Sequence, residues 1–177
     1  MHARMPTRQE RLDLPFGSPG TAVDAPSVAA LRRDVAGLWD AYQASRFGYV
    51  TARLPGLLAR ALAASERHDG DQGSEARALL GLSYQLAAVQ LTKLGEAELA
   101  WIAADRGLNA VRGTGDQVVT GSLYRSVTHA LLSAGRYGEA VRLTEDAAAY
   151  LESGLSMPTP EFLSVYGTLF MADGFDP

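Results

Sequence analysis

LTKLGEAELAWIAADRGL at residues 91–108 and LLSAGRYGEAVRLTEDAA at residues 131–148 are two copies of one pattern, 40 residues apart. In each copy a leucine is followed four residues later by a glycine, then by an alanine five residues after the glycine and by a small residue seven further on. These positions hold Leu91, Gly95, Ala100 and Gly107 in the first copy and Leu131, Gly135, Ala140 and Ala147 in the second. Small residues let antiparallel helices approach closely, and glycine suits the turn between them, so the pattern predicts a repeated helical hairpin.

Composition places the chain among ordinary globular proteins. Its 177 residues are 47% hydrophobic and 20% charged, which suits one domain with a sizeable core. A net charge of −4 and a pI near 5.3 disfavour direct binding to nucleic acid, because that binding depends on neutralising phosphates with Lys and Arg. There is no cysteine for a disulfide, no apolar run of membrane length and no signal-peptide core in MHARMPTRQERLDLPFG. We therefore expect a cytoplasmic protein that neither enters a membrane nor binds nucleic acid directly.

Apolar periodicity divides the chain into a leader and an all-α domain. Residues 1–26 are rich in proline and glycine and are expected to form a flexible leader or linker, and residues 27–177 to form the domain. Helices are predicted over 28–45, 74–93, 96–112, 117–134, 138–152 and 160–171, with Ser74, Asp116 and Thr159 as N-caps. Another follows Gly48, with Pro55 kinking or restarting it before a firmer part at 57–67, and HDGDQG at 68–73 is expected to be a loop.

Seven helices make three hairpins and one unpaired helix. The last helix carries Val165, Tyr166, Leu169 and Phe170, more apolar residues than a polar capping helix would have. We therefore expect this face to pack on another chain, through self-association or a protein partner, or on a continuation of the natural protein.

The hairpins resemble tetratricopeptide (TPR) repeats. Matching Gly95 to the turn glycine of that family places Tyr84 and Leu91 at large positions of the first helix, and Tyr137 matches the aromatic residue of the common G-x-Y-x-x-A stretch. The period of 40 rather than 34 residues departs from the family, and the hairpin before these two matches poorly. The resemblance implies a TPR-like right-handed solenoid of stacked antiparallel hairpins, with about seven helices.

A second resemblance covers about residues 28–172. LAWIAADRG and SVYGTL are the distinctive segments, and together with YQLAAVQLTKLGEAE and LYRSVTHALLSAGRYGEAVRL they look like the C-terminal region of actinobacterial XRE-family transcriptional regulators. In that family an N-terminal helix-turn-helix domain binds DNA, and the TPR-like region dimerises or receives a signal. We expect no helix-turn-helix before Leu31, because residues 1–26 are too short and too rich in proline to form one. The resemblance therefore implies a regulatory role for this chain and carries over no DNA-binding role.

Candidate binding residues follow from the repeat register. In TPR arrays the first helix of each hairpin lines a groove, and the matching positions here are Trp39, Tyr42, Gln43, Gln85, Val89, Thr92, Lys93, Arg125, His129 and Leu132. Aromatic and arginine side chains are favoured anchors at interfaces. Trp39 and Tyr42 suit a core equally well. Arg125 and His129 are four residues apart on one helix face, where they hold a carboxylate or phosphate, make a buried structural hydrogen bond, or form a solvated edge.

Sequence offers little for catalysis, metals or cofactors. His68, Asp69 and Asp71 supply too few converging ligands for a metal loop, and GTGD at 113–116 lacks the Lys-Ser/Thr of a phosphate loop. No cofactor or metal is expected, and no enzyme. Our hypothesis is a sensor, dimerisation or protein-interaction module that binds a protein, peptide or small molecule in the groove. The alternatives are a stand-alone adaptor that binds another protein, and a small helical enzyme that reuses the groove as a pocket.

Overall fold

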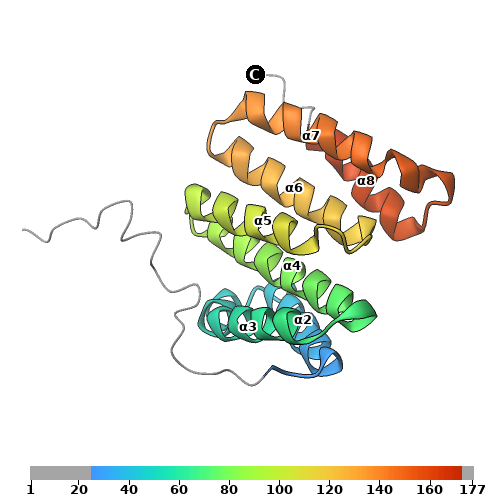
Figure 1. The fold of residues 1–177 in the computed structure, drawn as a ribbon. Coiled ribbons are helices and arrows are strands. Elements are labelled where there is room, and N and C mark those ends of the chain that lie inside the picture. Colours follow the sequence, from blue (N-terminus) through green and yellow to red (C-terminus); the bar gives the residue numbers. More distant parts are fainter. Residues whose placement is uncertain (1–24, 173–177) are drawn as a thin grey trace, which may run out of the picture.

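The computed structural model describes residues 25–172, with side chains through Leu169, and this part of the chain is helical (Figure 1). The helices are α2 (Val28–Gln43), α3 (Phe47–Arg67), α4 (Gly70–Lys93), α5 (Ala97–Val111), α6 (Gln117–Ser133), α7 (Tyr137–Leu151) and α8 (Pro160–Ala172), with a short 3₁₀ turn, η1 (Glu152–Ser156), before α8. The predicted leader lies mostly outside the described residues, as does the side chain of Phe170. None of the described helices combines the length and the apolar character needed to cross a membrane.

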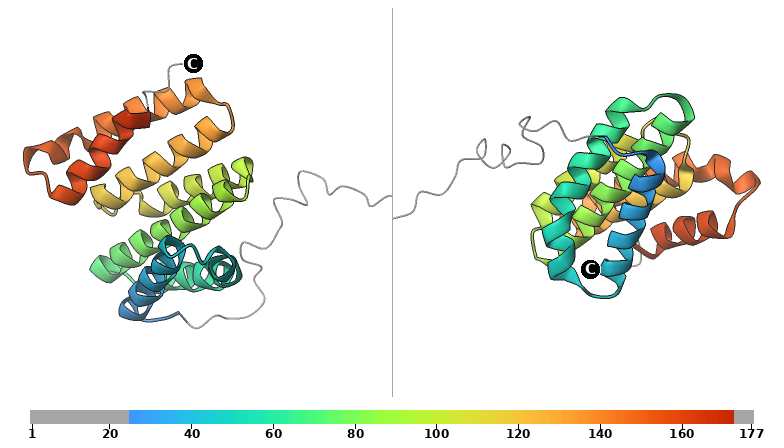
Figure 2. Two further views of the ribbon diagram at one scale, coloured as in Figure 1. Left: turned by 180° about the vertical axis from the view of Figure 1, so that it is seen from behind. Right: turned by 90° about the horizontal axis from the view of Figure 1, so that it is seen from below.

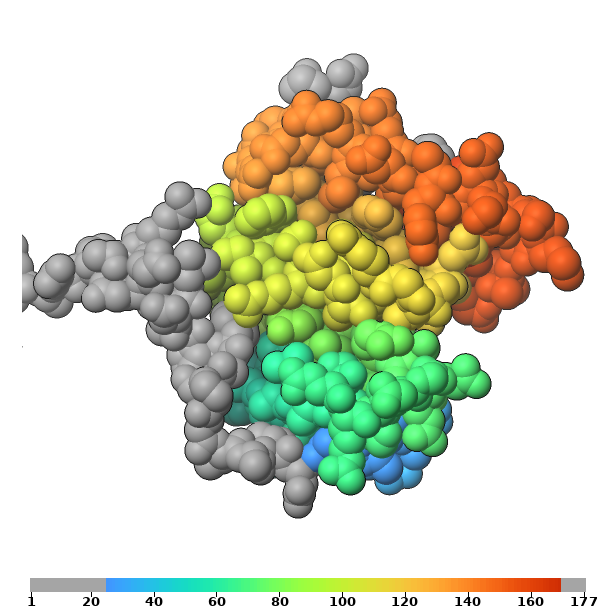
Figure 3. Space-filling view, viewed as in Figure 1, coloured from blue at the N-terminus to red at the C-terminus, as the bar shows by residue number. Residues whose placement is uncertain are grey.

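The helices form three successive pairs, α2 with α3, α4 with α5 and α6 with α7 (Figures 1 and 2). The first helices of the pairs also contact one another, because α4 packs against both α2 and α6. Helix α8 lies against α6 and α7 at the end farthest from α2 and α3, and the α4–α5 pair fills the middle (Figure 3). The all-α prediction is confirmed, and α2, α4 and α6 form a connected layer.

One turn geometry joins the helices within all three pairs. The residue before each second helix's N-cap has a positive φ, at Ser45 (58°), Gly95 (79°) and Gly135 (73°). The N-cap amide then donates to a carbonyl five residues earlier at 2.9 Å in every case, which pairs Arg46 with Ala41, Glu96 with Leu91 and Arg136 with Leu131. The two predicted turn glycines are therefore confirmed, and the first hairpin has the same turn with serine in place of glycine.

The predicted small positions lie where helices approach closely. A Cβ added at Gly107 of α5 would lie 2.5 Å from Leu123 Cδ2, 3.2 Å from Tyr84 Cβ and 3.3 Å from the Gly81 carbonyl oxygen. The equivalent Ala147 of α7 is fully buried, as is Ala100 of α5. Only small side chains fit these contacts, which is why the repeated pattern holds alanine and glycine there.

Two predicted boundaries were wrong. Helix α4 begins at Gly70 rather than Ser74, so most of the expected HDGDQG loop is helical, and Asp69 rather than Ser74 is the N-cap residue. Gly73 lies in this first turn because a Cβ there would collide with the carbonyl oxygen of His68. Helix α3 begins at Phe47 and continues through Pro55 to Arg67 as one helix.

Two predicted N-caps are confirmed by their hydrogen bonds. Asp116 Oδ1 accepts from the Val119 amide at 2.9 Å, and Thr159 Oγ1 accepts from the Phe162 amide at 3.1 Å. Both side chains satisfy a donor that the first turn of a helix leaves without a backbone partner.

The expected apolar face of helix α8 is covered in part within the chain, while Leu163 of the same helix is 49% exposed, and packing of this helix on another chain stays a prediction. Leu169 is fully buried, in a cluster with Ala147, Leu151 and Phe162. Val165 packs against α6 closely enough that a Cβ on Gly121 would lie 2.6 Å from its Cγ1. Tyr166 is half-buried and stacks on Phe162 with ring centroids 6.0 Å apart. Leu169 is therefore covered within the chain, and Val165 and Tyr166 are covered in part, because α6 and α7 pack against them.

Candidate binding groove across α2, α4 and α6

A cleft of about 390 Å³ lies across the layer of first helices. We call it the groove, and its lining residues are Tyr42 of α2, Val89, Thr92 and Lys93 of α4, and Arg125, Ser126 and His129 of α6. Six of these seven were among the positions predicted from the repeat register. Ser126 was not predicted, because its small side chain gave no sign of binding.

One end of the groove is aromatic. The Tyr42 ring makes edge contacts with Trp39 at 5.8 Å and with Phe47 at 5.4 Å between centroids. Lys93 Nζ lies 5.2 Å from the centroid of the Phe47 ring, within range of a cation–π contact. Burial raises the pKa of the Tyr42 hydroxyl above its ordinary value of 10.0, because ionisation is disfavoured away from water. Tyr42 therefore presents a neutral hydroxyl beside an apolar surface at physiological pH.

The other end, on α6, is cationic through Arg125. His129 lies one helical turn further along α6, and both side chains are exposed, while Lys93 adds a second positive charge from α4 beside the aromatic end. No carboxylate is among the residues that line the groove. The groove therefore suits a negatively charged group next to an apolar or aromatic one.

A buried polar network supports α6 beneath the groove. Gln85 of α4 is only 3% exposed, and its Nε2 donates to the Ser122 carbonyl oxygen at 2.9 Å and to Ser126 Oγ at 3.1 Å. The Ser122 hydroxyl donates back to Gln85 Oε1 at 3.2 Å. Gln85 thus joins α4 to α6 and does not reach the groove, so its predicted place on the lining was wrong.

Three other predicted residues lie off the lining. Trp39 is half-buried and packs against the core behind Tyr42, and its Nε1 has no hydrogen-bond partner among the described residues. Leu132 also packs against the core, and Gln43 is exposed outside the cleft. Thr92 does line the groove, but its hydroxyl donates to the Ala88 carbonyl oxygen at 3.0 Å. It presents mainly its methyl group and a lone pair.

No convergent metal site occurs within residues 25–169, where no three His, Asp or Glu side chains come together. His68 lies with its Nε2 3.2 Å from the Pro26 carbonyl oxygen, which ties the start of α2 to the α3–α4 connection.

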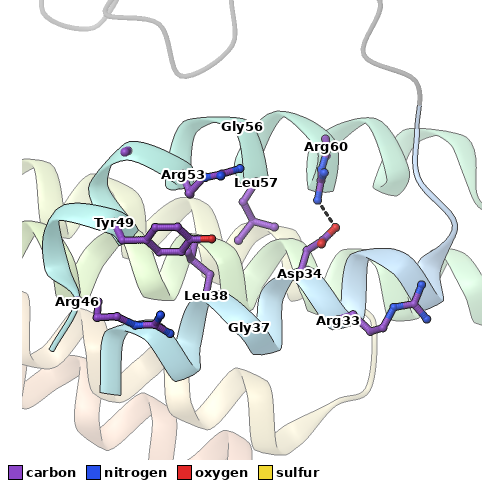
Figure 4. A pocket seen from close by; sticks show the side chains of 11 residues that line it. Arg33, Asp34, Gly37, Leu38, Arg46, Tyr49, Arg53, Gly56, Leu57 and Arg60 are labelled. Carbon is purple, nitrogen blue, oxygen red and sulfur yellow. Dashed lines mark hydrogen bonds and ion pairs between the residues drawn. The ribbon is translucent and has the colours of Figure 1, made fainter. Parts of the chain in front are cut away.

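Sequence analysis missed a second pocket, between α2 and α3 (Figure 4). It contains Arg46, Arg53 and Arg60, which recur every seven residues and so share one helix face. That spacing was visible in the sequence. The repeat register does not indicate it, because that register marks only the first helices of the hairpins and these arginines belong to a second helix and its N-cap.

Compared with protein-family models, with curated proteins and with solved structures, the chain has no significant match.

Proposed function

We propose that this chain is a TPR-like repeat domain that binds an acidic peptide segment of a partner protein in the groove. The observation that carries the proposal is the composition of this cleft. The first helices of three hairpins contribute Tyr42, Lys93 and Arg125 to one lining, which has an aromatic end, a cationic end and no carboxylate. A peptide with an Asp, a Glu or a terminal carboxylate next to an apolar side chain would satisfy both ends at once.

The packing supports the TPR-like part of this proposal. Three hairpins share one turn geometry, and their first helices α2, α4 and α6 form a connected layer. A stack of equivalent hairpins presents such a layer as a continuous binding surface. The right-handed solenoid and the relation to the C-terminal region of XRE-type regulators belong to the proposal, with peptide binding as the event that a regulator would sense.

A display screen of random peptides against the full chain tests this function. We expect the selected peptides to combine Asp or Glu with an aromatic or aliphatic residue, and fluorescence polarisation to give their Kd. Loss of a charge-assisted hydrogen bond costs about 1.5–3 kcal/mol, so Arg125→Gln should weaken binding about tenfold or more.

The matched control is Arg142→Gln, which removes the same charge from an exposed position on α7 outside the groove. It should leave the Kd unchanged. Selection of basic peptides, or equal losses of affinity in the two variants, would refute the proposal.

A further inference from the structure

The pocket between α2 and α3, which we call the arginine pocket, shares no lining residue with the groove. Its volume is about 400 Å³, in the range of small-molecule sites. The lining consists of Arg33, Asp34, Gly37 and Leu38 from α2, Arg46 at the N-cap of α3, and Tyr49, Ala52, Arg53, Gly56, Leu57 and Arg60 from α3 (Figure 4). It therefore belongs to a single hairpin.

The lining carries an excess of positive charge. Four of its residues are arginines, and its one carboxylate, Asp34, forms an ion pair with Arg60. Within residues 25–169, no carboxylate forms an ion pair with Arg33, Arg46 or Arg53. The whole chain has a net charge of −4, so this local excess arises from where the arginines are placed. Uncompensated guanidinium groups in a concave site favour an anionic ligand.

Tyr49 holds two of the arginines together. The Cζ atoms of Arg46 and Arg53 lie 5.6 Å and 5.4 Å from the centroid of its ring. Figure 4 shows these three side chains gathered at one end of the pocket and the Arg60–Asp34 pair at the other. An aromatic ring that contacts two guanidinium groups keeps their positive charge and their N–H donors at this end of the pocket.

Two glycines keep the pocket open between those ends. Gly37 of α2 and Gly56 of α3 lie on the facing helices, and a Cβ added at either would meet no atom within 4 Å. Neither has a positive φ. Neither close packing nor a left-handed backbone therefore requires glycine at these two positions. Glycine inside a helix nevertheless costs about 0.5–1 kcal/mol of stability relative to alanine. Their effect is to leave space where side chains would fill the pocket.

The third hairpin supplies an internal comparison. Arg136 is the N-cap residue of α7, at the position that Arg46 occupies in the first hairpin. Arg136 donates to both carboxylate oxygens of Glu139, at 2.8 Å from Nε and 2.5 Å from Nη2. The residue three positions after Arg46 is Tyr49, which cannot neutralise it. The same guanidinium position is thus paired within the chain in one hairpin and left without a carboxylate in the other.

We propose that the arginine pocket binds a small organic phosphate, with its phosphate group held by Arg46 and Arg53. Guanidinium groups match phosphate oxygens through parallel N–H donors, and a phosphate offers enough oxygens for two of them. The remaining volume, between Gly37 and Gly56, accommodates the organic part. This site is independent of the groove and of the peptide that the groove is proposed to bind.

Calorimetric titration of the full chain with pyrophosphate tests the proposal, with sulfate at equal ionic strength as the comparison. We expect pyrophosphate to bind more tightly than sulfate, and the double variant Arg46→Gln/Arg53→Gln to lose at least tenfold in affinity. Arg142→Gln makes a matched control for each arginine removed and should bind as the original chain does. Because Arg125→Gln changes only the groove, it should also leave pyrophosphate binding intact.

Tyr49→Glu is a sharper variant, because it places a carboxylate three residues after Arg46, as Glu139 stands to Arg136. Tyr49 is 49% exposed, so the thermal midpoint should change little while pyrophosphate binding is lost. The proposal is overturned if pyrophosphate gives no heat beyond a chloride blank, or if Arg142→Gln loses as much affinity as the double variant. It is equally overturned if a DNA oligonucleotide binds through these arginines and pyrophosphate does not.

Discussion

Replacing Gly95 by alanine should destabilise the protein, although the site has room for a side chain. A Cβ at Gly95 would meet no atom within 4 Å, so the cost lies in the backbone, whose φ is 79°. An L-residue in this region costs about 1–2 kcal/mol, and about 0.4–1 kcal/mol is recovered because alanine restricts the unfolded chain. We therefore expect the free energy of unfolding to fall by about 1 kcal/mol, or about 2–4 °C in Tm for a domain of this size.

Two companion variants separate the backbone effect from other causes. Ser45 has φ 58° at the equivalent turn, so Ser45→Gly should raise stability by about 0.5 kcal/mol. Gly37 has equally open surroundings but no positive φ, so Gly37→Ala should raise stability by about 0.5–1 kcal/mol. Urea unfolding followed by circular dichroism measures all three. If Gly95→Ala proved as stabilising as Gly37→Ala, the shared left-handed turn would be wrong.

Three further predictions concern the packing and the groove. Gly107→Ala should lower the free energy of unfolding by about 1–3 kcal/mol, because the new methyl group overlaps Leu123 between α5 and α6. Urea unfolding measures this change, and an unchanged midpoint would contradict the close approach of the two helices. Gln85→Leu should cost about 1–3 kcal/mol in the same assay, because the Ser122 carbonyl oxygen and the Ser126 hydroxyl both lose the buried amide that donates to them. Tyr42 ionisation should occur above pH 10, seen as the difference in ultraviolet absorbance between the original chain and Tyr42→Phe. Because the pKa of Tyr42 is raised in the folded state, its contribution to stability is present below the unfolded-state pKa and is lost as the pH rises through the folded-state pKa. Ionisation of Tyr42 below pH 10 would refute this prediction.

The helices were predictable from the sequence where their ends obey local rules. The turn at Gly135 could be placed because its left-handed backbone favours glycine, and the caps at Asp116 and Thr159 because their side chains reach the first turn of the next helix. The start of α4 could not, because Gly73 marks a close approach to His68 rather than a break in the helix. A glycine alone does not distinguish these two causes.

The groove was partly predictable for a related reason. The repeat register gives the direction in which a side chain leaves its helix, and this placed Tyr42 and Arg125 on one cleft. How far a side chain then reaches depends on the neighbouring helix. Gln85 has the right direction, but α6 lies close enough to bind both ends of its amide. Such burial is a property of the assembled helices, and a single helix carries no sign of it.

The first hairpin shows why a repeat pattern does not predict the arginine pocket. Both proposed sites meet at its turn, because the Phe47 ring contacts Tyr42 of the groove and the preceding residue, Arg46, lines the arginine pocket. Gln90 of α4 fixes the turn by donating to the Phe47 carbonyl oxygen at 3.2 Å. A repeat pattern reflects what equivalent turns share, which here is the backbone conformation. Ser45 keeps that conformation but has serine where the other two turns have glycine. Binding depends on what they do not share, so the hairpin that matches the pattern least well carries the most distinctive chemistry.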